Sequence, residues 1–198
     1  MKPTVFSAAL DDHLEVVAKL RPSLPLLEEV AERMYAALAA GGKVLWFGNG
    51  GSAADAQHLA AELVGRFRRE RRGMASIALT TDTSVLTSIG NDYGFECIFS
   101  RQLEALCAPG DVAVGISTSG NSPNVCAGLE KAREMGAYTF AMTGQGGGKV
   151  SRIADACLYV ASGEAARIQE AHILAGHMLC DALEEAICRE VQALVAAE

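Results

Sequence analysis

The sequence lacks any apolar run that approaches the length of a membrane span, which takes about 20 residues. Its first thirty residues also lack the apolar core of a secretion signal, because they contain Asp11, Asp12, Glu15, Glu28 and Glu29. Positive charge is scarce: 17 lysines and arginines stand against 24 aspartates and glutamates, a net charge of -7. This balance does not favour binding to nucleic acid or to anionic lipid. We therefore expect a cytoplasmic protein that acts on a small molecule.

Other absences exclude particular kinds of site. The six cysteines form no Cys-x-x-Cys pair, so we expect them to pack as small apolar side chains in a reducing compartment. No Gly-Lys-Ser/Thr motif is present, which excludes a nucleoside triphosphate P-loop. The chain has no repeat, low-complexity segment or long linker. Its 198 residues, 50% of them hydrophobic, are enough for a sizeable core, and we expect a single domain over residues 1–198.

Strand and helix patterns alternate along most of the chain. Short segments rich in β-branched or apolar residues predict strands at 43–47, 76–79, 112–116, 138–142 and 157–160. Their alternation with helical patterns predicts an α/β fold with a five-stranded parallel sheet and helices on both faces.

Helical patterns also flank the predicted sheet. Two helices are expected before it, at 5–20 and 22–40, the second starting at Pro22 or Ser23 and ending at Gly41-Gly42. One long helix is expected at 164–196. Terminal helices of this length often pack between subunits.

A glycine loop follows the first predicted strand. Gly48-x-Gly50-x-x-Ala53 matches a dinucleotide-binding fingerprint, but the stretch that should supply an acidic ribose ligand, 65–72, is basic. The better interpretation is a glycine turn with Ser52 as helix cap and free amides facing the carboxyl ends of the strands. Asn49 could bond substrate hydroxyls there. The alternative is a tight turn whose glycines serve only geometry.

A second loop, 117–122, follows the third predicted strand and reads Ser-Thr-Ser-Gly-Asn-Ser. Ser122 suits a helix cap and Pro123 the first helical position. Four hydroxyls at the positive end of a helix predict a site for a phosphate. The alternative is a hydrophilic cap without a ligand.

Ionisable and amide side chains mark two helices. His58 and Glu62 are one helical turn apart and share a face. Gln169 and His177 are eight residues apart, about 12 Å along a helix, so one straight helix would strain to bring both to one ion. Either Gln169 bends inward from the end near the loops, or the two residues come from different subunits. We expect His172, which faces a third direction, to be structural.

Two further polar segments are open to more than one interpretation. A cluster of five arginines is expected to form a solvated or subunit-facing connector: Arg66, Arg68, Arg69, Arg71 and Arg72. Asn91-Asp92 predicts a loop or turn whose polar side chains either meet a sugar or cap the next helix.

Several of these motifs, in fixed order, together resemble the bacterial phosphoheptose isomerases of the sugar-isomerase (SIS) superfamily. The segments that carry the resemblance are 48–58, 61–63, 80–84, 90–94, 117–122 and 167–170. The resemblance implies a flavodoxin-like SIS domain, with helices 1–40 serving oligomer packing and 41–198 forming the sheet core and the C-terminal helix. It also implies a homotetramer with active sites at subunit interfaces.

The resemblance further implies roles for individual residues. One Zn2+ per subunit would be bound by His58, Glu62, Gln169 and His177, and Glu62 and His177 would be the acid–base pair. The phosphate would be held by Ser117, Thr118, Ser119 and Ser122. The sugar would be contacted by Asn49, Gly50, Gly51, Asn91 and Asp92, with His58, Glu62 and Gln169 also lining the substrate site.

The activity implied is the isomerisation of sedoheptulose 7-phosphate to D-glycero-D-manno-heptose 7-phosphate, a precursor of the heptose in lipopolysaccharide cores. Two alternatives remain at this point. One is a non-catalytic SIS-domain adaptor that binds the replication initiator, which would not need the carboxylate of Glu62. The other is an isomerase of another sugar phosphate, which would share all of the chemistry.

Overall fold

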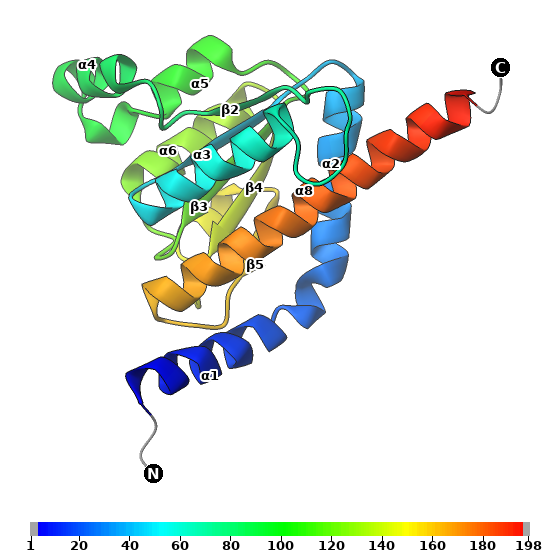
Figure 1. The fold of residues 1–198 in the computed structure, drawn as a ribbon. Coiled ribbons are helices and arrows are strands. Elements are labelled where there is room, and N and C mark those ends of the chain that lie inside the picture. Colours follow the sequence, from blue (N-terminus) through cyan, green and yellow to red (C-terminus); the bar gives the residue numbers. More distant parts are fainter. Residues whose placement is uncertain (1–3, 196–198) are drawn as a thin grey trace.

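The structure, a computed structural model, describes residues 4–195 (Figure 1). It contains one five-stranded sheet in the order β2-β1-β3-β4-β5, with every neighbouring pair parallel. The strands are β1 (Val44–Gly48), β2 (Ser76–Ala78), β3 (Val112–Ser117), β4 (Tyr138–Thr143) and β5 (Ala156–Tyr159). Each strand begins and ends within two residues of its predicted segment. The predicted five-stranded parallel α/β sheet is therefore confirmed.

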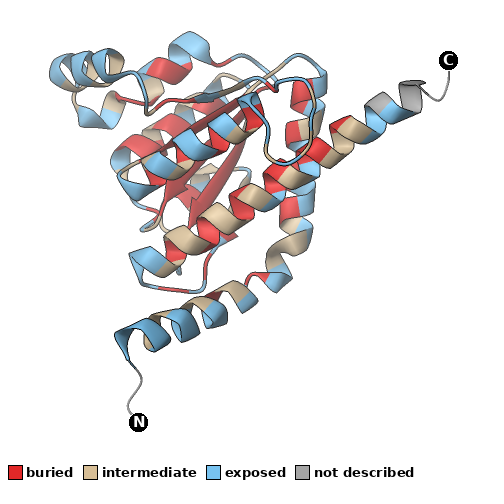
Figure 2. Ribbon diagram, viewed as in Figure 1, coloured by how far each residue is buried: buried red, intermediate tan, exposed pale blue. Residues whose placement is uncertain are grey.

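Helices cover both faces of the sheet, as predicted. Side chains alternate along β1, so Trp46 packs into the core under α2, α3 and α8, whereas Leu45 and Phe47 pack into the core under α5 and α6. The central strands β1 and β3 are buried along their whole length, which explains why their sequences are continuous apolar runs (Figure 2).

The helical elements also follow the predicted layout at both ends of the chain. The N-terminal region forms α1 (Val5–Ala18), a 3-10 turn η1 (Arg21–Ser23) and α2 (Leu24–Ala39). Ser23 is the N-cap of α2, and the helix ends just before Gly41-Gly42, as predicted. The remaining elements are α3 (Gly51–Val64), α4 (Thr83–Tyr93), η2 (Phe95–Cys97), α5 (Ser100–Leu106), α6 (Pro123–Glu134), α7 (Val150–Ile153) and α8 (Ala165–Val195).

The long helix α8 lies beside α3, and the two run in the same direction. At one end Gly51 meets the side chain of Gln169, and further along Gly176 meets Leu59. A Cβ atom at Gly176 would come within 2.5 Å of the Leu59 methyl groups, so glycine is needed for this close approach. The pairing brings side chains from two distant parts of the sequence together along one seam.

The prediction that His172 is structural is confirmed, and the prediction that the cysteines are packed side chains is confirmed for three of the six. His172 on α8 is fully buried, and its Nε2 donates a hydrogen bond of 3.3 Å to the backbone carbonyl of Thr143. All six cysteines are free thiols, and Cys107, Cys126 and Cys180 are buried.

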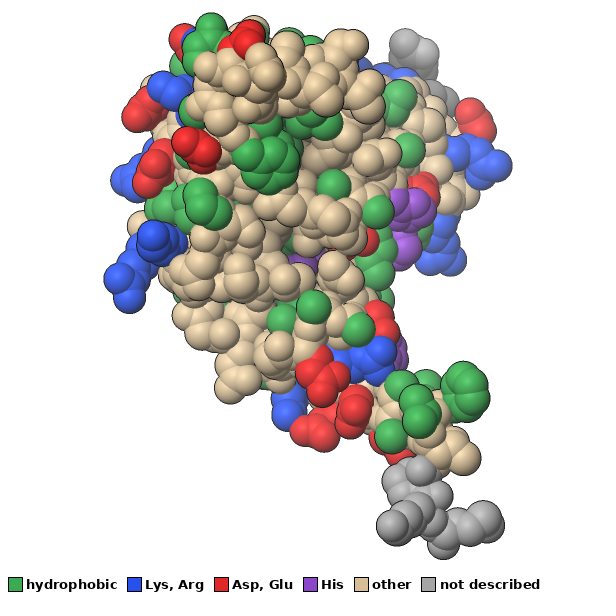
Figure 3. All heavy atoms as spheres, turned by 90° about the vertical axis from the view of Figure 1, so that its left-hand side faces the viewer, with side chains coloured by type: hydrophobic (Ala, Val, Ile, Leu, Met, Phe, Trp, Pro, Cys, Tyr) green, Lys and Arg blue, Asp and Glu red, His purple; other side chains and the backbone are tan. Residues whose placement is uncertain are grey.

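The helix α1 projects from the body of the molecule and contacts it mainly through the beginning of α8 (Figure 1). His13 binds Glu170 across this contact, with 2.7 Å between Nδ1 and Oε2. Most of α1 is exposed, and hydrophobic side chains gather on this projection (Figure 3): Val5, Phe6, Leu10 and Leu14. No helix within residues 4–195 is long and apolar enough to cross a membrane.

Candidate active site

The two predicted loops meet where the strand order reverses. Strand β1 leads into the glycine loop, and its neighbour β3 leads into the hydroxyl loop 117–122. The chain continues from β1 to β2, toward one edge of the sheet, and from β3 to β4, toward the opposite edge. In open parallel sheets, ligands bind in the crevice outside the carboxyl ends of the strands at such a reversal. We therefore expect the ligand-binding site in this crevice.

The glycine loop begins helix α3 differently from the prediction. Ser52 was expected to be the N-cap, but Gly50 takes that position, with φ 56°, and Ser52 is buried in the first turn. The carbonyl of Gly50 accepts the N–H groups of Ala53 and Ala54, so the helix starts before the serine. Gly51 is the first helical residue, and its missing side chain leaves room for Gln169.

An amide pair joins the two loops. The side chains of Asn49 and Asn124 exchange two hydrogen bonds of 2.8 Å each, and Asn124 is buried. Asn124 also accepts the N–H of Val125 at 3.0 Å. Asn49, a predicted sugar contact, is thus held in place with one N–H and one lone pair left for a ligand. Sequence reasoning missed Asn124, although a polar residue on the buried face of α6 is a signal that could have found it.

The hydroxyl loop gathers at the N-terminus of α6. Ser122 is the N-cap and Pro123 the first helical residue, as predicted. The Ser122 hydroxyl does not bond to the helix; instead its Oγ lies 3.0 Å from the Oγ of Ser117. Thr118 is half-buried and Ser119 is exposed, with its Oγ accepting the N–H of Asn121 at 3.2 Å. The uncapped helix end and its hydroxyls suit an anion such as a phosphate.

A cluster of three ligating side chains lies on the seam between α3 and α8. The Nε2 atoms of His58 and His177 are 2.8 Å apart, and Oε1 of Glu62 lies 3.3 Å from Nε2 of His58. One ligand atom from each residue falls within 4.8 Å of the others. His58 is about half exposed and Glu62 one-fifth exposed, so the cluster is open to a substrate.

The charge state of the cluster favours a cation. Burial lowers the pKa of His177, and the neighbouring His58 lowers it further, against the opposing effect of Glu62. Two imidazole nitrogens 2.8 Å apart need a proton or a metal ion between them, because their lone pairs repel. Two histidines and one carboxylate are a known donor set of catalytic zinc sites, which keep a further position open. The three residues therefore fit a zinc ion.

Asp55 is one turn before His58 on α3 and was not singled out from the sequence. Burial raises its pKa to about 6, while His58 lowers it. Its Oδ2 is buried and accepts no hydrogen bond within residues 4–195. Its spacing of three residues from His58, which places both on one face of α3, was the sequence signal that could have identified it.

Gln169 contacts the start of α3 in the single chain. Its side chain packs against Gly51, seven residues before His58 on α3, and α8 is continuous from Gln169 to His177. Of the two alternatives from the sequence, an inward bend of Gln169 from the end near the loops stays a prediction. A site that combines residues of different subunits also stays a prediction.

Asn91 and Asp92 do not form the predicted loop or turn. They occupy the last turn of α4, which ends at Gly94 with φ 93°. The helix continues through them because Asp82 caps its start and nothing before Gly94 breaks it. Both side chains are exposed, and Nδ2 of Asn91 donates to Oδ1 of Asp92 at 2.8 Å. Contact with a sugar stays a prediction for both.

The arginine cluster between α3 and β2 is only partly a solvated connector. Arg66 and Arg68 are exposed, but the Arg71 side chain is 2% exposed and pairs with the fully buried Glu184 at 3.2 Å. The expectation of a solvated charge run is therefore wrong for Arg71. Its partner lies more than a hundred residues away, so no local pattern could reveal it.

Comparisons with known proteins agree with this geometry. The SIS domain family matches residues 8–144. A phosphoheptose isomerase of Aquifex aeolicus is 64% identical over 160 residues, which cover 81% of this chain and 84% of the relative.

Two solved structures share the fold along nearly their whole length. A phosphoheptose isomerase of Neisseria gonorrhoeae is 44% identical with a TM-score of 0.86, covering 91% of this chain and 97% of that one. Another from Francisella tularensis is 35% identical with a TM-score of 0.88, covering 91% and 96%. The chain belongs to the SIS domain family and, within it, to the phosphoheptose isomerases.

Proposed function

We propose that the protein is an aldose–ketose isomerase that converts sedoheptulose 7-phosphate into D-glycero-D-manno-heptose 7-phosphate in the cytoplasm, for lipopolysaccharide heptose. The observation that carries the proposal is the convergence of His58, Glu62 and His177 on the helix pair that borders the crevice. Relatives named phosphoheptose isomerase support the choice of substrate.

The reaction moves two protons. A base removes a proton from C1 of the ketose, and the electrons of that C–H bond form the C1–C2 double bond of an enediol while an acid protonates the C2 oxygen. The C1 hydroxyl then loses its proton, and C2 accepts one to give the aldose. We assign proton removal and return to the carboxylate of Glu62 and the imidazole of His177. The lowered pKa of His177 keeps this imidazole neutral near pH 7, which is the form that can bind a metal ion or accept a proton.

The other site residues bind and orient the substrate in this proposal. Its phosphate is assigned to Ser117, Thr118, Ser119 and Ser122, and its hydroxyls to Asn49, Gly50, Gly51, Asn91 and Asp92. One Zn2+ per subunit is assigned to His58, Glu62 and His177, with Gln169 as a further ligand that another subunit can supply. When bound, Zn2+ would act as a Lewis acid that stabilises negative charge on a substrate oxygen, which lowers the activation free energy by several kcal/mol.

We also propose a homotetramer with active sites between subunits. The large apolar side chains exposed on α1 support an assembly, because a helix face of this kind is rarely left in water: Val5, Phe6, Leu10 and Leu14. The contact of Gln169 with Gly51, seven residues before His58 on α3, supports a shared site.

The test is the purified protein with sedoheptulose 7-phosphate and, in parallel, with ketose phosphates of shorter chains. We expect the seven-carbon substrate to react with the highest kcat/KM. Activity should fall after removal of metal with a chelator and return with Zn2+. Faster reaction of a shorter sugar would indicate the alternative isomerase, and no reaction together with capture of the replication initiator would indicate the adaptor.

A further inference from the structure

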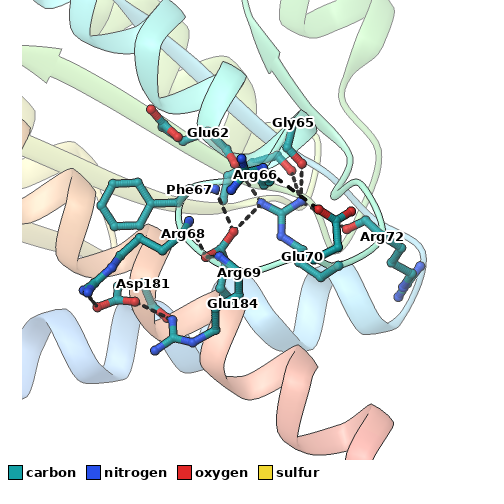
Figure 4. A network of polar contacts seen from close by, with 12 residues as sticks. Glu62, Gly65, Arg66, Phe67, Arg68, Arg69, Glu70, Arg72, Asp181 and Glu184 are labelled. Carbon is teal, nitrogen blue, oxygen red and sulfur yellow. Dashed lines mark hydrogen bonds and ion pairs between the residues drawn. The ribbon is translucent and has the colours of Figure 1, made fainter.

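The loop between α3 and β2 is anchored from inside the protein. The carboxylate of Glu184, on α8, accepts the backbone N–H groups of Phe67 at 2.7 Å, Arg68 at 2.8 Å and Arg69 at 2.9 Å (Figure 4). Burial alone would raise the pKa of Glu184, but these three donors and Arg71 lower it below its ordinary value. The buried carboxylate is therefore ionised and holds three consecutive residues.

Arg71 closes the anchor from the other side. Besides its ion pair with Glu184, its Nη2 donates to the carbonyl of Glu62 at 2.7 Å. Its Nη1 donates to the carbonyls of Leu63 at 2.8 Å and Gly65 at 2.9 Å. These carbonyls belong to the end of α3, so one guanidinium ties the last turn of the helix that carries Glu62 to the loop that follows it.

This anchor places the ring of Phe67 against His177. The two rings are stacked, with centroids 5.1 Å apart and an angle of 26° between planes. His58 meets the same imidazole edge-on, with centroids also 5.1 Å apart and an angle of 68°. Both spacings lie within the usual range for aromatic pairs. Rotation of the His177 ring is therefore restricted by Phe67 and by His58, in the orientation that turns Nε2 toward His58.

We propose that Phe67 is a positioning residue that holds the His177 imidazole toward His58 and Glu62, and that the buried pair of Glu184 and Arg71 holds Phe67 there. The inference rests on the proposed function, because it takes His177 as a metal ligand and proton-transfer group. Residues that orient a ligating histidine contribute strongly to metal affinity although they do not touch the ion.

The test compares metal binding by the full-length protein after its metal has been stripped. Co2+ is titrated and followed by its visible absorption, and Zn2+ is measured by competition with a chromophoric chelator. We expect Phe67→Ala to weaken binding of both ions by about 10- to 100-fold and to change the spectrum of bound Co2+ at saturation. It should lower kcat while KM changes little.

Two matched variants separate positioning from general damage. Phe67→Tyr keeps the ring and should restore the affinity and the Co2+ spectrum of the wild type. Glu70→Ala, in the same loop with a side chain that is 93% exposed, should behave as wild type. A Phe67→Ala protein with wild-type affinity and an unchanged Co2+ spectrum would overturn the proposal.

The anchor itself is tested with Glu184→Gln, which should weaken Zn2+ binding in the same direction. Because this change leaves the Arg71 charge buried without its partner and threatens folding, the Phe67 variants decide the question. Failure of the proposed function looks different, because then the wild type itself neither binds Zn2+ nor isomerises the sugar.

In that case the ring contact is still measurable by proton NMR of the metal-free protein. The His177 ring resonances, assigned with His177→Asn, should carry a ring-current displacement that Phe67→Ala removes. Unchanged resonances in Phe67→Ala would overturn the positioning role.

Discussion

Glu62 is the residue on which the proposed chemistry depends most. Its carboxylate lies 3.3 Å from His58 and remains one-fifth exposed, so it is held in place and still reachable by a substrate. No other carboxylate within residues 4–195 shares a possible metal group with two histidines.

We predict that Glu62→Gln loses activity by orders of magnitude while fold and assembly are kept. The amide has the same shape but cannot accept the proton, and general-base catalysis is worth roughly 10²- to 10⁴-fold. Steady-state kinetics of the variant measure the loss. Glu185→Gln, which removes a half-exposed carboxylate of α8, is the control and should be fully active. A Glu62→Gln enzyme within about tenfold of wild type would contradict the assignment of the base.

At the scale of elements, α8 joins the site to the sheet, and His172 is one of the contacts that fix it. The imidazole is fully buried under β4, and burial lowers its pKa to about 4, against the opposing effect of its hydrogen bond to Thr143. The folded protein therefore keeps His172 neutral at a pH where the unfolded chain protonates it. Stability from this group is fully present above the unfolded pKa of about 6.5 and is lost as the pH falls toward 4.

We predict that His172→Gln reduces the acid sensitivity of folding. Between pH 7 and pH 4 the wild type should lose on the order of 3 kcal/mol more unfolding free energy than the variant. Urea unfolding at several pH values and one fixed protein concentration measures the difference. If the unfolding free energy of both proteins changed equally with pH, the prediction would be wrong, because His172 would then have the same pKa in the folded and unfolded states.

Element types were predictable from the sequence, whereas several contacts were not. The central strands β1 and β3 were predictable as short apolar runs because helices cover both faces of the sheet there. The start of α3 was misplaced because Gly50 takes the turn and cap position that Ser52 would otherwise fill. The end of α4 was missed because Asn91-Asp92 resembles a turn, although the helix is stopped by Gly94.

The other features that could not be predicted are contacts between elements that lie far apart in the sequence. His58 and Glu62 could be paired from their spacing, but His177 joins them only because α3 and α8 run side by side. The exchange between Asn49 and Asn124 likewise depends on β1 and β3 being neighbours. Spacing along the chain carries no information on such pairs.

At the scale of the whole molecule, the projecting helix α1 exposes apolar side chains that a single chain does not cover. Phe6 is 87% exposed and Leu10 58% exposed, one turn apart on the same face. Exposed apolar stripes of this kind mark interaction sites. The helix is nevertheless fixed at its contact with α8, so it presents a defined surface.

We predict that replacing both Phe6 and Leu10 by Asp dissociates the proposed homotetramer. Charges on the apolar stripe oppose burial, whereas the core of the subunit does not include these residues. Sedimentation measures the mass, and circular dichroism checks that helix and sheet content are kept. Asp11→Ala, on an exposed position of the same helix, is the control. A double variant with the mass of the wild type, or a wild type that is monomeric, would contradict the prediction.

The central claim is that this chain moves a carbonyl group by proton transfer through an enediol. Proton NMR of the purified protein with sedoheptulose 7-phosphate in deuterated water tests it most directly, with and without a chelator. The account predicts heptose 7-phosphate that carries deuterium at C2, and no conversion after chelation until Zn2+ is added back. Product that still lacks deuterium at C2 after many turnovers at equilibrium, or no conversion with the metal restored, would contradict it.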